Sequence, residues 1–141
     1  MPLVRESRTF PARRDALPQV GAFLAQVCEA AGIGRATCLR LTLLVEELFT
    51  NTVVHGHGGD SDEPVCLQCE AAPGRMALVY EDTAPAFDPF AQVAMPDVVA
   101  SVEDRPVGGL GVLLVSEMAQ QIEYRRDGNR NRISLVVATC V

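Results

Sequence analysis

Three polar side chains recur at four-residue intervals in an otherwise apolar segment. Glu47, Asn51 and His55 lie in the sequence LVEELFTNTVVHG. If this segment is a helix, residues four apart share one face, and the three side chains form a polar stripe. A carboxylate and an amide oxygen in this arrangement suit a hydrated Mg²⁺ ion, and the carboxylate could also accept a proton from an attacking hydroxyl or water. The simpler interpretation is the exposed face of an ordinary helix.

A second carboxylate stands where a strand is expected to end. Asp82 follows the run MALVYE and precedes TAPAFDP. A carboxylate at the end of a strand can face a cleft and accept a hydrogen bond from an adenine amino group, a donor that a site can discriminate sharply. The alternative is an Asx-turn, in which Asp82 would only bond the backbone of the Thr-Ala-Pro segment that follows it.

A third feature is the glycine cluster Gly108, Gly109 and Gly111 before a segment with helical character. Such glycines let backbone N–H groups approach phosphate oxygens at a helix N-terminus. The spacing is neither that of a Rossmann fingerprint nor that of a P-loop. All twelve basic residues are arginine, which excludes the P-loop lysine and the lysine of eukaryotic-type kinases. A flexible hinge would explain the glycines equally well.

The elements that must position these residues follow from hydrophobic periodicity and turn signals. In chain order, we expect an edge strand over 5–12, helices over 15–31 and about 35–54, strands over 65–71 and 76–81, a long loop over 82–107, a helix over 112 to about 120, and strands over 122–126 and 132–137. Strands paired by short turns indicate a largely antiparallel sheet, and amphipathic helices would cover one face. The predicted fold class is therefore an α+β two-layer sandwich, formed by residues 1–141 as a single domain.

Composition narrows the classes of function. The net charge of −6 argues against a nucleic-acid binder, which normally carries a basic face. No run approaches the roughly 18 apolar residues of a membrane span, and the N-terminal residues lack a signal-peptide core. We therefore expect a cytoplasmic protein that binds neither nucleic acid nor membrane. Cys66 and Cys69 form a C-x-x-C, but in a strand they would point to opposite faces, so we expect free thiols without a metal or redox role.

Together, the three motifs resemble those of the anti-sigma-factor serine/threonine kinases, which are single-domain members of the GHKL superfamily of gyrase, histidine kinases and MutL. The segment 47–56 (ELFTNTVVHG) resembles the N-box, 81–89 (EDTAPAFDP) the G1 box, and 108–112 (GGLGV) the G2 box, and the hairpin over 124–131 resembles the closing hairpin. The resemblance spans essentially the whole chain and implies the GHKL, or Bergerat, ATP-binding fold. One departure is that the residues after Asp82 contain no glycine, which implies a stiffer loop.

The resemblance also implies a role for each matching residue. Glu47 would be the general base and Asn51 the Mg²⁺ ligand, while Asp82 would bind the adenine amino group. Glu46, beside Glu47, is a second candidate for the base, although the spacing to Asn51 favours Glu47. Further ATP contacts are expected from Phe87, Gly108, Gly109, Leu110 and Gly111, with the segment from about 90 to 107 as a lid in which Arg105 is the candidate for the γ-phosphate.

The function implied by the resemblance is that of an ATP- and Mg²⁺-dependent protein serine/threonine kinase in a partner-switching circuit. It would phosphorylate a STAS-domain anti-anti-sigma-like protein and, when free, bind a sigma factor or another effector and so regulate transcription. The alternative is a nucleotide-gated protein-binding regulator with little phosphoryl transfer. A sensor histidine kinase fits less well, because His55 and His57 lie at a helix end and in a loop. A homodimer is left open.

Overall fold

A five-stranded antiparallel sheet forms one layer of the molecule. The computed structural model describes residues 3–90, 116–117 and 119–139. The strands are β1 (Val4–Pro11), β2 (Pro64–Ala72), β3 (Arg75–Asp82), β4 (Ala119–Asp127) and β5 (Arg130–Ala138), in the spatial order β1-β2-β3-β5-β4. Three of the four strand pairs are therefore sequence neighbours, and the fourth pairs β3 with β5 across the chain segment between them.

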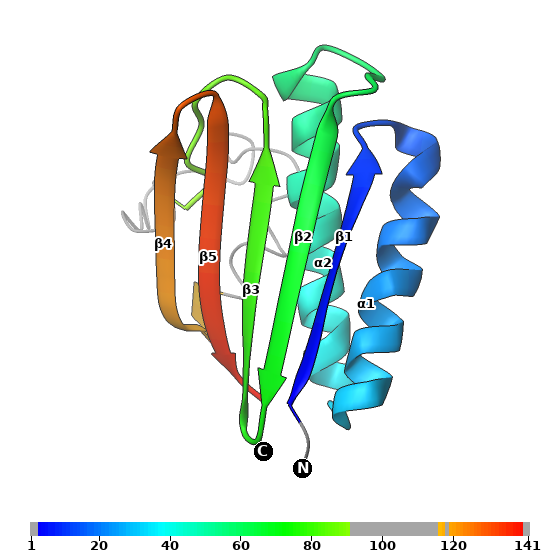
Figure 1. Ribbon diagram of the computed structural model, residues 1–141, viewed down its shortest axis with the longest axis vertical. Coiled ribbons are helices and arrows are strands. Elements are labelled where there is room, and N and C mark those ends of the chain that lie inside the picture. Colours follow the sequence, from blue (N-terminus) through cyan, green and yellow to red (C-terminus); the bar gives the residue numbers. More distant parts are fainter. Residues whose placement is uncertain (1–2, 91–115, 118, 140–141) are drawn as a thin grey trace, which may run out of the picture.

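The helices lie together on one face of this sheet (Figure 1). After a short 3₁₀ turn, η1 (Arg14–Ala16), come α1 (Leu17–Ala31), α2 (Arg35–Asn51) and η2 (Thr52–Gly56), a π-helical turn that continues α2. Gly32 ends α1 in the left-handed conformation with φ of 70°, where a residue without a Cβ is favoured. The predicted α+β two-layer sandwich is confirmed.

The core lies between the two layers and follows from simple periodicities. Buried residues of α1 recur at helical spacing, and in β3 and β5 every second residue points inward. The inward rows of these two strands begin or end on polar residues, Asp82 and Asn131. Together with Thr52 they are the buried polar residues of the described part of the chain.

Two of the predicted boundaries are corrected by the structure. The helix expected to reach about residue 120 ends earlier, because Ala119 already begins β4 and pairs with Val137. The second helix, expected to reach residue 54, is α-helical only to Asn51 and then widens into η2. There the N–H of His57 donates to the carbonyl oxygen of Thr52 over 2.9 Å.

Two predictions made from the sequence concern the C-x-x-C cysteines and membrane-spanning segments, and both can be compared with the described residues. Cys69 faces the core, whereas Cys66 is half-buried on the other face of β2, as expected for strand residues three apart. No helix within ranges 3–90 and 116–117 is both long and apolar enough to cross a membrane.

Candidate functional site

Asp82 lies at the end of β3 with its carboxylate turned into the molecule. The residue is 7 % exposed. Its Oδ2 accepts a hydrogen bond from the Thr52 hydroxyl over 2.6 Å, and its Oδ1 accepts from Nδ2 of Asn131 over 2.8 Å and from the Ala84 N–H over 3.2 Å. The last bond is the Asx-turn that the sequence offered as the alternative. A carboxylate has about four acceptor positions, and the described donors fill three of them, which leaves one on Oδ2.

Thr52 connects Asp82 to the helical layer. Its hydroxyl oxygen lies 2.7 Å from the Tyr80 hydroxyl and 2.9 Å from the carbonyl oxygen of Leu48. Burial raises the pKa of Tyr80 well above its ordinary value of 10, so the phenol keeps its proton and can donate to Thr52. The single proton of Thr52 is then best placed on the Asp82 carboxylate, which is charged and closest. A buried chain of hydroxyls therefore runs from β3 through η2 and back to β3.

Glu47, Asn51 and His55 are brought together as the four-residue spacing predicts. They line a groove of about 340 Å³ on α2 and η2, a size within the usual range for small-molecule sites. The other lining residues are Leu43, Glu46, Thr50 and Val54. Asn51 lines the groove, and the next residue, Thr52, bonds Asp82, so both the groove and the link to the buried carboxylate begin at the end of α2. The catalytic and metal-binding roles of Glu47 and Asn51 stay predictions.

The two adjacent glutamates both line the groove, but their surroundings differ. Glu46 carries its carboxylate beside α1, since its Oε1 lies 3.9 Å from the point where a Cβ on Gly21 would stand. Glu47 is one helical step further round and lies in line with Asn51 along the groove. The described residues contain no group of three or more His, Cys, Asp or Glu side chains that could hold a metal ion. A magnesium ion held by Asn51 would therefore take its other ligands from phosphate oxygens and water, as Mg²⁺ commonly does.

The residues directly after Asp82, here called the 83–87 segment, pack closely against η2. A Cβ added to Gly56 would stand 2.6 Å from the Cβ of Ala84, well inside contact distance. Arg126 on β4 also reaches this segment and donates from its guanidinium to the Ala84 carbonyl oxygen over 2.7 Å. Gly56 is therefore needed for the close approach of helix end and segment, besides marking the helix stop that the sequence suggested.

Among the described residues, Asn131 forms the most hydrogen bonds to the 83–87 segment. Its Nδ2 donates to the carbonyl oxygens of Ala84 over 3.1 Å and Pro85 over 3.0 Å, and its Oδ1 accepts from the Phe87 N–H over 3.2 Å. The Tyr124 hydroxyl donates to the same Oδ1. Phe87 is 57 % exposed, so its predicted contact with nucleotide is compatible with its position.

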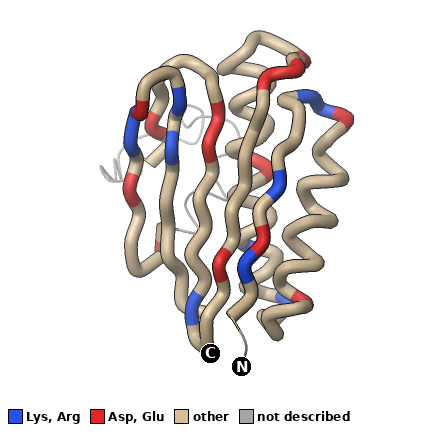
Figure 2. Tube along the Cα trace, in the orientation of Figure 1, with Lys and Arg blue, Asp and Glu red and all other residues tan. Residues whose placement is uncertain are grey.

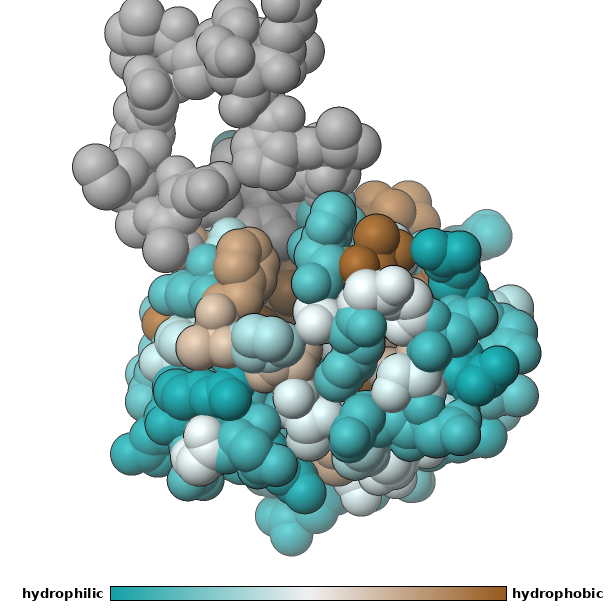
Figure 3. Space-filling model, turned by 90° about the horizontal axis from the view of Figure 1, so that it is seen from above, coloured by the Kyte–Doolittle hydropathy of each residue, from teal (hydrophilic) through white to brown (hydrophobic). Residues whose placement is uncertain are grey.

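Figure 3 looks onto the end of the sheet where β3 finishes, and it shows mostly hydrophilic residues with a few hydrophobic ones between them. The neighbouring carboxylate, Glu81, points the other way from Asp82 and pairs with Arg130 and Arg132 of β5. Figure 2 shows acidic and basic positions close together on neighbouring strands near the β4–β5 hairpin. Glu81 is therefore paired with two arginines, whereas Asp82 forms no ion pair with an arginine among the described residues.

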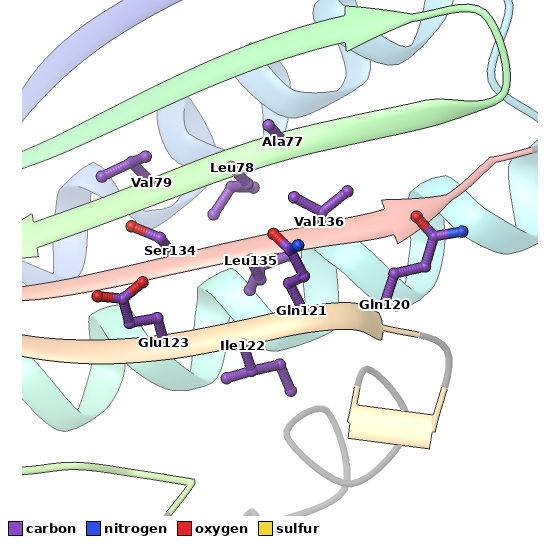
Figure 4. Close-up of a pocket in the computed structure, with 10 residues that line it drawn as sticks. All are labelled: Ala77, Leu78, Val79, Gln120, Gln121, Ile122, Glu123, Ser134, Leu135 and Val136. Carbon is purple, nitrogen blue, oxygen red and sulfur yellow. The ribbon is translucent and has the colours of Figure 1, made fainter.

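A second hollow among the described residues lies elsewhere. It has a volume of about 600 Å³ and lies over β3, β4 and β5 (Figure 4). Its residues are Ala77, Leu78, Val79, Gln120, Gln121, Ile122, Glu123, Ser134, Leu135 and Val136. Glu123 is the single ionisable side chain in this set, and no nucleophile–base pair accompanies it. Glu47, Asn51 and Asp82 are absent from its lining, so this hollow is not the candidate site.

Sequence reasoning missed two central residues, Thr52 and Asn131. Each carried a signal, because each is a polar residue on a face that is otherwise apolar. Thr52 follows Leu48 on the buried face of the helix, and Asn131 precedes Ile133 and Leu135 in the inward row of β5. Several predicted site residues, Arg105, Gly108, Gly109, Leu110 and Gly111, lie outside the described residues, as does the lid predicted over about 90–107 except for Phe90, which is buried.

Comparison with known proteins places this geometry in context. Residues 10–137 match a protein family described as a histidine kinase-like ATPase domain. The match includes α2, η2, β3 and all of β5 except its last residue, and so contains the described residues that hydrogen-bond Asp82, which are Thr52, Ala84 and Asn131. No curated protein sequence matches the chain.

Proposed function

This chain belongs to the histidine kinase-like ATPase domain family, and on that premise we propose that it is an ATP-dependent protein serine/threonine kinase of a partner-switching circuit. Its substrate would be a Ser or Thr of a STAS-domain anti-anti-sigma-like protein. When free of that protein, it would bind a sigma factor or another effector and act as an anti-sigma factor in the cytoplasm. The family membership supports ATP as the nucleotide, and the motif resemblance supports the partners.

The observation that carries the proposal is the placement of Asp82. Its buried carboxylate keeps one acceptor position while its remaining positions are filled from η2, β5 and the 83–87 segment. An adenine amino group can donate a hydrogen bond to this acceptor, whereas the 6-oxo group of guanine has no proton to donate. Thr52 links the same carboxylate to the end of α2. The adenine ring would therefore lie next to the groove that is lined by Glu47 and Asn51.

The chemistry proposed for the groove is transfer of the γ-phosphoryl group. The substrate hydroxyl oxygen bonds to the γ-phosphorus, the bond from that phosphorus to the β,γ-bridging oxygen breaks, and ADP leaves with the electron pair. Glu47 takes the hydroxyl proton. Asn51 would hold Mg²⁺, and the bound ion would neutralise charge on the phosphates. The phosphate contacts are assigned by the motif resemblance to Arg105 and to Gly108, Gly109, Leu110 and Gly111.

Nucleotide binding is tested first, because all later steps depend on it. We expect titration calorimetry to detect ATP binding in the presence of Mg²⁺, and Asp82→Ala to abolish it. Asp88→Ala is the matched control: Asp88 bonds only the nearby Phe90 N–H among described residues, and its loss should leave ATP affinity nearly unchanged. Tight ATP binding by the Asp82→Ala protein would exclude the adenine assignment.

Phosphoryl transfer is tested next with γ-labelled ATP, Mg²⁺ and each STAS-domain protein of the same genome. Label on a Ser or Thr of one of these proteins would support the kinase proposal and identify the partner. If ATP binds in the same samples but no label is transferred, the nucleotide-gated binding regulator becomes the better description. Its partner would then be sought by measuring association in the presence of ATP and of ADP.

A further inference from the structure

We propose that Asn131 is a positioning residue that sets the selectivity of the site for a 6-aminopurine by holding the 83–87 segment and the Asp82 carboxylate in one arrangement. This inference rests on the proposed nucleotide binding at Asp82. Asn131 lies on β5, opposite Asp82 on β3 in the strand register, and is 3 % exposed. It is therefore too deeply buried to be a surface residue that happens to lie near the site.

The hydrogen-bonding capacity of Asn131 is completely used within the protein. An asparagine side chain offers two N–H donors and an oxygen with two acceptor positions. Nδ2 reaches three acceptors, on Asp82, Ala84 and Pro85, and Oδ1 receives the Phe87 N–H and the Tyr124 hydroxyl. Because the backbone carbonyls can only accept and the Phe87 N–H can only donate, the orientation of the amide is determined. No position is left for nucleotide, so Asn131 acts through its neighbours.

The 83–87 segment depends on side chains for its attachment. Among the described residues, it makes no backbone-to-backbone hydrogen bond to the sheet or helices. Three of its backbone groups bond Asn131, one of these also bonds Arg126, and the Ala84 N–H bonds Asp82. The segment contains no glycine, so its conformation is restricted by its own residues. Asn131 of β5 supplies three of the hydrogen bonds that hold it, and Arg126, Asp82 and Glu63 supply one each.

The amide group of Asn131 also determines what Asp82 can recognise. With Oδ1 bonded by Asn131 and the Ala84 N–H, the carboxylate cannot rotate, and its remaining acceptor position stays on Oδ2. That position favours a purine carrying a 6-amino donor and disfavours a 6-oxo purine, because two facing acceptors would both be left without a proton. Without Asn131 the carboxylate and the segment can rearrange around either base.

The experiment compares ATP with ITP, in which a 6-oxo group replaces the 6-amino group. Titration calorimetry with Mg²⁺ gives the two dissociation constants for the intact chain and for Asn131→Ala. We expect the intact protein to prefer ATP strongly and Asn131→Ala to lower the ratio of ITP to ATP dissociation constants at least tenfold. Tyr124→Phe, which removes one of the two bonds to Oδ1, should lower the ratio by a smaller factor.

Two controls separate positioning from general destabilisation. Leu135→Ala creates a cavity on the same strand and should lower stability while leaving the selectivity ratio of the folded protein unchanged. Ser134→Ala changes the opposite face of β5 and should alter neither the stability nor the selectivity ratio. An unchanged ratio in folded Asn131→Ala would overturn the inference while leaving the kinase proposal intact. Absence of ATP binding by the intact protein would instead overturn both.

A measurement on the unmodified chain covers the case in which Asn131→Ala does not fold. The Phe87 amide proton is donated to Asn131, so hydrogen exchange followed by NMR should find it protected, although it lies in a segment without secondary structure. The neighbouring amide of Ala86, which has no hydrogen-bond acceptor among the described residues, serves as the reference. Exchange of Phe87 as fast as that of Ala86 would contradict the holding role of Asn131.

Discussion

Asp82 and Glu47 are carboxylates placed in different surroundings, and the difference separates their proposed roles. Asp82 is buried and receives three hydrogen bonds from the protein, so its position is fixed. Glu47 is half-buried in a groove at the end of α2, where a carboxylate can meet a substrate hydroxyl. A general base needs such access, because the proton must be within hydrogen-bond reach.

The neighbouring glutamate supplies a matched test of the base. We expect Glu47→Gln to leave ATP affinity about unchanged and to lower the rate of phosphoryl transfer by about 10²- to 10⁴-fold, the usual contribution of a general base. Glu46→Gln makes the same chemical change at a carboxylate that leans toward α1, and should spare the rate. Single-turnover kinetics with labelled ATP would measure both. A larger loss in Glu46→Gln would reassign the base to Glu46.

At the scale of elements, the end of α2 is held by side-chain chemistry as well as by its backbone. Thr42 and Thr52 on this helix each place a hydroxyl 2.8–2.9 Å from the carbonyl oxygen four residues earlier. Only Thr52 also reaches β3, through Tyr80 and Asp82. The helix widens to a π turn at this residue, a distortion frequent at functional sites, so the irregular turn and the link to the sheet coincide.

The two threonines allow the interlayer link to be measured. Thr52→Val keeps the shape of the side chain but leaves the Tyr80 hydroxyl and Asp82 Oδ2 without their partner. We expect the free energy of unfolding to fall by about 1–3 kcal/mol and ATP affinity to weaken. Thr42→Val removes a hydroxyl that bonds only Cys38, and should change stability by no more than about 0.5 kcal/mol. Urea unfolding measures both, and equal losses would show that the link to β3 adds nothing.

The contact between η2 and the 83–87 segment makes a second prediction about elements. The backbone of Gly56 does not have a positive φ, so alanine is permitted there by conformation, yet its methyl would meet Ala84 at 2.6 Å. We expect Gly56→Ala to destabilise the protein by about 1–3 kcal/mol through overpacking.

Exchanging the two side chains tests whether this contact is the cause. In the double variant Gly56→Ala/Ala84→Gly the methyl group is moved from one partner to the other, and part of the lost stability should return. A thermal or urea unfolding cycle over the wild type, both single variants and the double variant gives the coupling energy. If the losses of unfolding free energy in the two single variants simply add in the double variant, the cost of Gly56→Ala does not come from its contact with Ala84.

At the scale of the whole molecule, the core contains several groups that must stay protonated. Burial raises the pKa of the Cys69 thiol from 9.0 to about 12. Burial, and then the neighbouring Cys38, raise the pKa of Cys28 further. Tyr80 behaves likewise, with burial as the main cause. Each of these groups is neutral in the folded protein at a pH where the unfolded chain would already lose its proton.

These pKa shifts predict the pH dependence of stability. Because the unfolded chain releases these protons from about pH 9 upward and the folded protein retains them, rising pH favours unfolding. Stability should be nearly constant from pH 7 to 8 and then begin to fall, reaching about 1.4 kcal/mol per pH unit for each buried thiol above about pH 9 and for Tyr80 above about pH 10. Urea unfolding in a reducing buffer between pH 7 and 11 measures the slope.

Cysteine variants of β2 identify the source of that slope. Cys69→Ala removes one buried thiol and should make the decline above pH 9 shallower. Cys66→Ala, on the opposite face of the same strand, should leave the decline unchanged. Stability that stays constant to pH 11 would show that the buried thiols and Tyr80 do not ionise on unfolding as proposed.

Local patterns were sufficient for much of this protein. Alternation in the strands and helical spacing in α1 and α2 predicted the antiparallel α+β sandwich, because side-chain direction repeats every two residues in a strand and every 3.6 in a helix. The same rule brought Glu47, Asn51 and His55 to one groove. Asp82 could be predicted at the end of a strand, since the apolar run stops there.

The contacts of those residues were decided only by tertiary structure. Asp82 meets Thr52 and Asn131 across 30 and 49 positions of sequence, and Gly56 meets Ala84 at the junction of the two layers. Periodicity says that Thr52 and Asn131 face the core, but not which polar group they will find there. That choice follows from the pairing of β3 with β5, from the strand register and from the packing of α2 on the sheet, which join segments that no local pattern relates.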